Sequence, residues 1–491
     1  MSTALTVLGR CAAAAVLVAP LVTATPALAA PSTVHWRPCD QVQEHWDPAD
    51  TRSECATVSV PLDHARPHGR RIDLAISRIR ATDPHRRRGV LLMNPGGPGN
   101  QGIDMPFAMT RTRFADLNTD HDLVGFDPRA VGSSGGVECE ATAEDGPEPD
   151  PGASPEARFR QDYERNARTN ARCIGYDREL LTNLSTRAVA DDMDLIRAAL
   201  GERKISFFGI SWGTALGAVY RSHHDRRVDR MVLDSVMPAD YTLETMNLGA
   251  SAAKQANYEV LAGWLAQRDE SSRLGATPQA VTASISALVA RLDAAPVTIT
   301  PPGGKPRTYS GSAVRSMLTY KREVWPRVAD SIVALRDGGV PPLTGDEPEL
   351  EGFGLTPVWY GGLLMQRAVH CNDQGRAPDV DEAWRQARHR EERYPFFRNG
   401  HGYGNWCAGW PLPATPWQLE RATSPLQLSG HRYETNTPLF FAEQMQRKIG
   451  GALLTVDDSA HGSLWAIDCA DKAVKFFRTG QTSNDACPGI S

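Results

Sequence analysis

The stretch that decides the fold reads Lys204-Ile-Ser-Phe-Phe-Gly209-Ile210-Ser211-Trp212-Gly213-Thr-Ala-Leu-Gly-Ala-Val-Tyr220. The apolar run before the glycines is typical of a buried strand, and the run after them is typical of a helix. A G-x-S-x-G motif at such a strand-to-helix turn lifts the serine hydroxyl above the sheet, so Ser211 is the candidate nucleophile. A second match, Gly132–Gly136, leads into no helix and predicts a loop around Ser134.

Strand-like and helix-like segments alternate on both sides of this motif. Strands are predicted at residues 72–80, 89–93, 122–126, 205–208, 231–233, 426–428 and 453–456. Helices are predicted at 186–200, 212–223, 438–449 and 464–478, the first with Thr186 as its N-cap and Gly201 as its stop. This order predicts an α/β fold with a mostly parallel sheet.

The alternation is interrupted between residues 241 and 411, where helical pieces and aromatic loops prevail. We therefore predict one core in two parts, residues 30–240 and 412–491, separated by a largely helical cap insertion at 241–411.

Residues 1–29 combine one Arg, a short apolar run and a terminal Ala27-Leu28-Ala29, which is typical of a cleavable secretory signal. Cleavage is expected after Ala29, and the mature protein is expected to be extracellular and free of a membrane span.

Nine cysteines are present, and signal cleavage would remove Cys11. The remaining eight form four near-neighbour couples: Cys39 and Cys55, Cys139 and Cys173, Cys371 and Cys407, Cys469 and Cys487. Structural disulfides are expected in an oxidising compartment, and sequential pairing is the simplest of 105 connectivities. The sequence contains no CxxC pair, so the cysteines give little support to a zinc site.

Composition narrows the function classes. The chain has 491 residues, 41% of them hydrophobic, and a formal charge of −5. The apolar content can fill a core, which excludes a wholly disordered chain. The mild acidity argues against a nucleic-acid binder.

A neutral serine hydroxyl is a poor nucleophile unless a base, itself oriented by an acid, takes its proton. In proteins with this motif the three catalytic residues follow along the chain in the order Ser, then Asp or Glu, then His. His461 follows the strand at 453–456 and is the candidate base. Glu434, which follows the strand at 426–428, is the candidate acid, with Asp457 and Asp458 as rivals.

Two backbone amides should stabilise the tetrahedral oxyanion, that of Trp212 and that of Gly97 in the Asn94-Pro-Gly-Gly-Pro-Gly99 loop. The same loop opens a G-x-G-x-x-G pattern at Gly97–Gly102, with Asp122 twenty residues on, which is the spacing of a dinucleotide site. Pro98 and the polar residues after it make a poor phosphate-binding helix start, so an oxidoreductase is the weaker alternative.

His223 and His224 beside Asp225 could suggest a metal pair, but a polar helix end is the favoured interpretation.

Taken together, these segments resemble the secreted bacterial tripeptidyl aminopeptidases, which are α/β-hydrolase serine exopeptidases related to proline iminopeptidases. The resemblance runs from about Trp36 to Cys469. It rests on these segments: Asn94–Gly99, Asp127-Pro-Arg129, Asn183–Thr186, Asp191–Asp194, Gly209–Gly213, Val232-Leu-Asp234, Ala368–Asp373, Trp406–Pro411 and the terminal His461-Gly462.

The resemblance implies roles for matched positions. Ser211 would be the nucleophile and His461 the base. Glu434 stands where the family usually has Asp before a Thr-Pro pair, here Thr437-Pro438. Asp373, in the insertion, would hold the substrate ammonium group, although a purely structural role beside Cys371 is an equal alternative.

We therefore expect a secreted, monomeric serine exopeptidase that releases short peptides from free N-termini through an acyl-enzyme, and the resemblance implies that these peptides are tripeptides. No metal, organic cofactor, nucleic acid or membrane partner is expected. Two alternatives stay open: a carboxylesterase or lipase with the same triad, and a non-catalytic relative of the same fold.

Overall fold

The computed structural model describes Met1 and residues 34–44, 46–136, 139, 145–150, 152–301, 303–345 and 360–490. The chain divides into two units, Met1–Ser32 and Thr33–Ser491. The predicted signal sequence lies outside the described residues. All elements below belong to the second unit.

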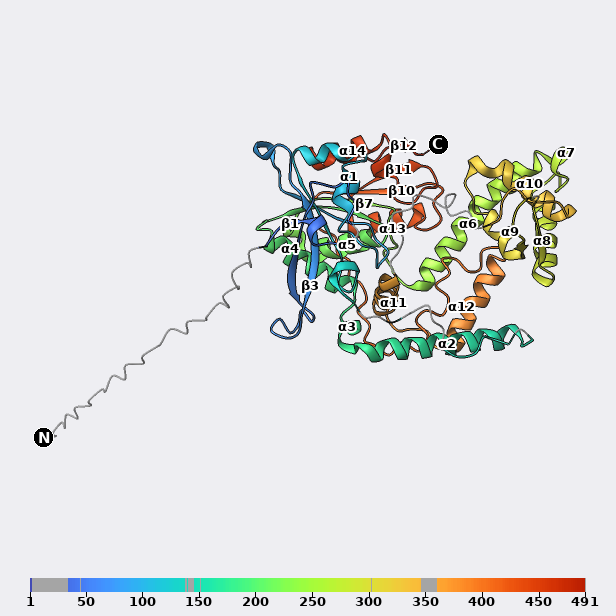
Figure 1. Ribbon diagram of the computed structural model, residues 1–491, viewed down its shortest axis with the longest axis horizontal. Helices are drawn as coiled ribbons and strands as arrows, with labels where there is room; N and C mark the ends of the chain where they lie inside the picture. The colour runs from blue at the N-terminus through green and yellow to red at the C-terminus, as the bar shows by residue number, and fades with distance from the viewer. Residues whose placement is uncertain are drawn as a thin grey trace. The chain divides into compact units, whose positions relative to one another are not determined.

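One large sheet forms the centre of this unit (Figure 1). Its strand order is β1-β2-β3-β5-β4-β6-β7-β10-β11-β12. The pairs β1–β2, β2–β3 and β3–β5 are antiparallel, and all later neighbours are parallel. The strands are β1 (Arg37–Pro38), β2 (Glu54–Pro61), β3 (Arg71–Ile79), β4 (Val90–Asn94), β5 (Asp122–Phe126), β6 (Ile205–Ile210), β7 (Val228–Asp234), β10 (Leu426–His431), β11 (Ala452–Asp457) and β12 (Ala486–Pro488).

Helices cover both faces of the sheet. Successive side chains of a strand point to opposite faces, so each strand can pack against helices on both sides. Phe207 of β6 packs into the cluster that contains residues of α4 and α5, whereas Phe208 packs into the cluster of α1 and α14. The core helices are α1 (Met105–Met109), α2 (Pro155–Tyr176), α3 (Arg178–Thr182), α4 (Thr186–Ala199), α5 (Trp212–His224), α13 (Leu439–Ile449) and α14 (Ala470–Thr479).

The predicted insertion, residues 241–411, lies between β7 and β10, although these two strands pair directly. It contains α6 (Leu243–Ala266), α7 (Asp269–Ser272), α8 (Pro278–Ala294), the hairpin β8 (Val297–Ile299) and β9 (Arg307–Tyr309), α9 (Gly311–Met317), η6 (Arg322–Val324), α10 (Trp325–Asp337), α11 (Tyr360–Asp373) and α12 (Val380–Arg393). Figure 1 shows α8, α9 and α10 gathered around α6. Their apolar side chains form a cluster of their own, which includes Tyr258, Leu288 and Trp325.

Some sequence predictions need correction. Thr186 is not the N-cap of α4: Ser185 is, because its hydroxyl accepts the N–H of Ala188, and Thr186 is the first helical residue. The segment 464–478 is a 3₁₀ turn, η8 (Leu464–Ala466), followed by α14. The sequence prediction missed α2 because the buried side of that helix is largely polar, with Arg165, Asn166, Thr169 and Asn170 among its buried residues.

Four disulfides each join two cysteines that follow one another along the chain: Cys39–Cys55, Cys139–Cys173, Cys371–Cys407 and Cys469–Cys487. The third lies inside the insertion, and the fourth links the start of α14 to β12.

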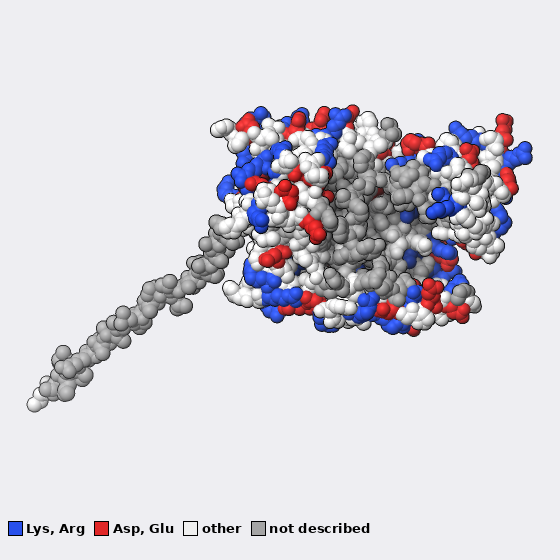
Figure 2. All heavy atoms as spheres, viewed as in Figure 1, with Lys and Arg blue, Asp and Glu red and all other residues white. Residues whose placement is uncertain are grey.

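In the described residues, no helix has the length and apolarity needed to cross a membrane. On the face in Figure 2, basic and acidic side chains are interspersed over most of the described surface.

Candidate active site

The candidate nucleophile sits on a sharp turn between β6 and α5. Ser211 has φ 58° and ψ −126°, a backbone conformation that non-glycine residues rarely adopt. Small neighbours make the turn possible: a Cβ on Gly209 would lie 2.4 Å from the carbonyl oxygen of Gly213. A Cβ on Gly213 would lie 2.6 Å from the carbonyl oxygen of Asn94. Both glycines of the motif therefore have a steric reason for their residue type.

The glycine-rich loop after β4 runs directly beside this turn. A Cβ on Gly96, at φ +97°, would lie 2.8 Å from Cβ of Ser211 and 3.0 Å from the backbone nitrogen of Trp212. The side chain of Asn94 supports the loop by accepting the N–H of Gly96 at 2.9 Å. Gly97 follows with φ +109°. The loop from which a second oxyanion donor is expected thus borders the Trp212 amide.

Glu434 and His461 form a direct pair. Oε1 of Glu434 lies 2.5 Å from Nδ1 of His461. The same oxygen accepts the backbone N–H of Thr437 at 2.9 Å and its hydroxyl at 2.5 Å. The other carboxylate oxygen accepts the hydroxyl of Ser235 at 2.9 Å. Both oxygens are engaged, so the carboxylate is fixed against the imidazole.

Glu434 stays ionised in this environment. Burial alone would raise the pKa of its carboxyl, but the charge and hydrogen bond of His461 and the donors around it outweigh burial and lower that pKa. An ionised acid holds the proton of His461 on Nδ1 and leaves Nε2 as the basic nitrogen.

The turn of Ser211 and the loop of His461 meet at the end of β7. The backbone N–H of Ser211 donates to the carbonyl of Asp234 at 3.1 Å. The hydroxyl of Ser235 accepts the N–H of Gly462 at 2.8 Å. A Cβ on Gly462 would lie 2.6 Å from Cγ2 of Ile210, the residue before the nucleophile. Ser235 was not predicted from the sequence; its place directly after a strand end was the available signal.

The rival acids have other partners. Asp457 is exposed and pairs with Arg432 at 2.9 Å. Asp458 is buried and lies 2.7 Å from Nδ1 of His431. Of the three acids considered from the sequence, Glu434 is the one in contact with His461.

The insertion contacts the loop that carries Glu434. Asn257 of α6 donates to the carbonyl of Tyr433 at 2.7 Å. Nε2 of His401 lies 2.6 Å from the carbonyl of Asn436 and donates to it, because a carbonyl can only accept. Burial lowers the pKa of His401 to about 4, so this imidazole is neutral at pH 7.

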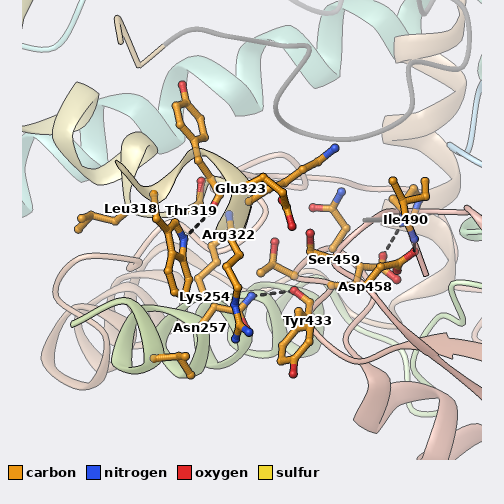
Figure 3. A pocket seen from close by; sticks show the side chains of 18 of the residues that line it. Lys254, Asn257, Leu318, Thr319, Arg322, Glu323, Tyr433, Asp458, Ser459 and Ile490 are labelled. Atoms are coloured by element: carbon orange, nitrogen blue, oxygen red, sulfur yellow. Dashed lines mark hydrogen bonds and ion pairs between the residues drawn. The ribbon is translucent and has the colours of Figure 1, made fainter. Parts of the chain in front are cut away.

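A cavity of about 370 Å³ opens beside His461, between the insertion and the C-terminal part of the core. In Figure 3, Arg322 and Glu323 of the insertion lie on one side, and Asp458 and Ser459 lie on the other. The Arg322 guanidinium lies 5.4 Å from the ring centre of Tyr433. Glu323 is exposed, and among the described residues its carboxylate has no ion-pair partner.

Asp373, predicted to hold the substrate ammonium group, lies elsewhere. It is 1% exposed and does not line the cavity. Its carboxylate accepts the N–H and hydroxyl of Thr186 and the indole N–H of Trp417. The hydroxyl of Thr186 in turn accepts the indole N–H of Trp212 at 2.8 Å. This burial and these donors disagree with a direct substrate contact and agree with the structural alternative.

The remaining candidates have structural partners. His223 lies 2.7 Å from Arg187, His224 lies 2.9 Å from Asp191, and Asp225 accepts the backbone N–H groups of residues 423 and 424. Asp122 accepts the N–H of Ala81 and pairs with Arg87. Among the described residues, no group of three metal-ligating side chains is found.

The sequence is similar to those of several known proteins. A sequence model of the α/β hydrolase fold matches residues 89–322, and one described as TAP-like protein matches residues 394–487. The tripeptidyl aminopeptidase of Streptomyces lividans is 30% identical over 446 residues, which cover 87% of this chain and 82% of that protein. The chain belongs to the tripeptidyl aminopeptidase family. Membership of this family makes it an α/β hydrolase and a serine peptidase homologue.

Other members of the family carry different names. The serine protease Hip1 of Mycobacterium tuberculosis is 28% identical over 497 residues, covering 94% of this chain and 91% of that protein. A protein named carboxylesterase B, from the same organism, is 30% identical over 446 residues, covering 87% and 84%.

Proposed function

We propose that this family member is a secreted exopeptidase that removes tripeptides from free N-termini through an acyl-enzyme. The observation that carries the proposal is the Glu434–His461 pair, held by Ser235 beside the turn of Ser211. The family relationship supports a peptide substrate, and the insertion beside His461 supports restricted access to chain ends.

The chemistry follows from the arrangement. Oγ of Ser211 attacks the scissile carbonyl carbon, while Nε2 of His461 takes the hydroxyl proton. The backbone amides of Trp212 and Gly97 stabilise the oxyanion. The imidazolium then gives its proton to the leaving amine, and the acyl-enzyme forms. A water molecule, deprotonated by His461, attacks the ester carbonyl and releases the peptide from Ser211.

Exopeptidase specificity needs a group that recognises the free ammonium. With Asp373 buried, we assign this role to Glu323. Its carboxylate belongs to the insertion, lines the cavity beside His461 and has no ion-pair partner among the described residues. A carboxylate without a partner in a partly enclosed cavity gains the most from pairing with an ammonium group.

The proposal is tested with tripeptidyl anilides whose N-terminus is either free or acetylated. The wild-type enzyme should release the anilide only from free-amine substrates, and Ser211→Ala should lose both turnover and labelling by a fluorophosphonate. Equal cleavage of blocked and free substrates, or activity retained by Ser211→Ala, would overturn the proposal. A ladder of free peptides of increasing length then gives the number of residues released.

Ester hydrolysis is the second candidate function, because a relative of equal identity is named a carboxylesterase. The same triad would serve both reactions. The two are separated by the ratio of kcat/KM for short-chain nitrophenyl esters to that for free tripeptidyl anilides. Efficient ester cleavage without any anilide release would favour the esterase.

Secretion is supported by the four disulfides and by the signal-like pattern of residues 1–29. N-terminal sequencing of the protein from culture medium should begin at Ala30. Retention of the whole protein inside the cell would contradict this assignment.

A further inference from the structure

A second histidine lies buried behind the candidate triad. His431 ends strand β10 and its side chain is fully buried. Its Nε2 lies 2.9 Å from Oδ1 of Asp234, and its Nδ1 lies 2.7 Å from Oδ1 of Asp458. The triad as described does not use this group.

The contacts fix the charge of His431. Carboxylates accept hydrogen bonds, so both ring nitrogens must carry protons, and the ring is an imidazolium. Burial alone would lower the pKa of His431, but the charge of Asp234 and the hydrogen bonds that the ring donates to both acids raise it well above its ordinary value. The groups that face it are Asp234 from β7, Asp458 after β11 and Glu434 on its own loop.

The two aspartates also hold the loop that carries His461. Asp458 accepts the N–H of Ala460 at 3.2 Å and the hydroxyl of Ser463 at 2.8 Å. The carboxylate of Asp234 accepts the N–H of Leu464 at 3.1 Å. Residues on both sides of His461 are thus fastened to acids that share one imidazolium.

We propose that His431 is a positioning residue: its imidazolium joins Asp234 to Asp458 and so fixes the His461 loop at the carboxyl ends of β7, β10 and β11. This proposal rests on the proposed function, in which His461 acts on Ser211. Without the imidazolium, two buried carboxylates would face each other, and the loop segments bonded to them would move apart.

The test compares His431→Gln with His121→Gln. His121 is a matched control because it is also buried and paired with an aspartate, at 2.9 Å from Asp120, but it lies beside the amino end of β5, away from the site. Both variants should lose thermal stability. In His431→Gln, kcat should also fall by about tenfold to a hundredfold with KM nearly unchanged, because a shift of about 1 Å at a catalytic group costs that much.

The pH profile gives a readout that a purely structural role would not move. Loss of the positive charge between Asp234, Asp458 and Glu434 should move the acid limb of the kcat/KM profile to higher pH. His121→Gln should keep the wild-type limb. Equal kcat and identical limbs in the two folded variants would overturn the proposal.

A milder change covers the case in which His431→Gln does not fold. Ser463→Ala removes one donor to Asp458 and keeps the imidazolium, so we expect a folded enzyme with kcat lowered severalfold. Wild-type kcat in Ser463→Ala would contradict the proposal. Ser211→Ala separates the two claims: if it retains activity, the proposed function fails, whereas normal turnover in the His431 and Ser463 variants refutes only the positioning role.

Discussion

Oε1 of Glu434 lies 2.5 Å from Nδ1 of His461, at the end of a side chain that is one methylene longer than aspartate. Thr437 and Ser235 bind the two oxygens from opposite ends of the carboxylate. The carboxylate is therefore held at both oxygens, and the effect of its side-chain length can be tested directly.

Replacement of Glu434 by Gln should lower kcat by about three to four orders of magnitude, because an amide cannot hold the required tautomer of His461. Glu434→Asp should retain more activity than the Gln variant but less than wild type, since it withdraws the carboxylate by about one bond length of 1.5 Å. Asp457→Asn is the matched control and should leave kcat unchanged, because that acid pairs with Arg432. Steady-state kinetics on active-site-titrated enzyme would measure all three. A wild-type rate in Glu434→Gln would remove this residue from the triad.

Gly96→Ala should abolish activity. The new methyl group would lie 2.4 Å from the carbonyl oxygen of Ile210 and 2.8 Å from Cβ of Ser211, so the loop or the turn must move. Gly201→Ala is the control: that residue also has positive φ, but nothing lies within 4 Å of the added carbon. The control should cost only about 1 kcal/mol of backbone strain and keep full activity. Comparable kinetics of the two variants would show that close approach at Gly96 is unimportant.

Asp373 should make the free energy of unfolding depend on pH. Burial raises the pKa of this carboxyl from 3.8 to about 7, against the donors of Thr186 and Trp417. The folded state therefore binds more protons than the unfolded state between these values, and this stabilising contribution is lost as pH rises from about 4 to about 7. Relative to Asp373→Asn, wild-type stability should fall across that window with a slope of at most about 1.4 kcal/mol per pH unit. Denaturant titrations at several pH values would measure it; parallel curves for the two proteins would contradict the assignment.

The mature protein should contain no free thiol. Thiol titration in denaturant without reductant should give none, and titration after reduction should give eight, because the described cysteines are all paired. Removal of the insertion's bridge in Cys371→Ala/Cys407→Ala should lower stability by about 3–4 kcal/mol, the value for a closed loop of this size. Detection of one reactive thiol per unreduced chain would refute the pairing.

Glu323→Gln should raise KM for free-amine tripeptides by about tenfold, as expected for the loss of one charge-assisted contact. Asp330→Asn, an exposed acid of α10 that does not line the cavity, is the matched control. Any cleavage of short-chain nitrophenyl esters, which carry no ammonium group, should be unaffected by either change. A normal KM in Glu323→Gln would place ammonium recognition elsewhere.

The sequence predicts those parts of the site that depend on local pattern. The strand, turn and helix around Ser211 show in hydrophobic periodicity and in three glycines. Glu434 and His461 follow from their places after successive strands. The His431 cluster is different, because it depends on side chains from three strand ends that only the folded sheet brings together. Asp373 was assigned by analogy of position, and no local pattern could show that Thr186 and Trp417 would enclose it.

The fold was predictable where apolar residues recur with a regular period. Helix α2 was not predicted because it buries arginine, asparagine and threonine side chains. Asn170, for example, donates to the carbonyls of Trp406 and Ala408 in the insertion. Polar contacts of this kind leave no periodic signal. The short edge strands β1 and β12 are also too brief for a pattern, and their pairing depends on neighbours far along the chain.

The insertion separates the parts of the site in the order of synthesis. Ser211 is made before it, whereas Glu434 and His461 are made after it, in the loops that follow β10 and β11, and β10 joins β7 on the side away from β6. A chain that ends between α5 and β11 therefore contains Ser211 but not His461. Under the proposed mechanism, such an enzyme cannot cleave peptides while it is still being synthesised, and its activity begins only once the segment that follows β11 has been added.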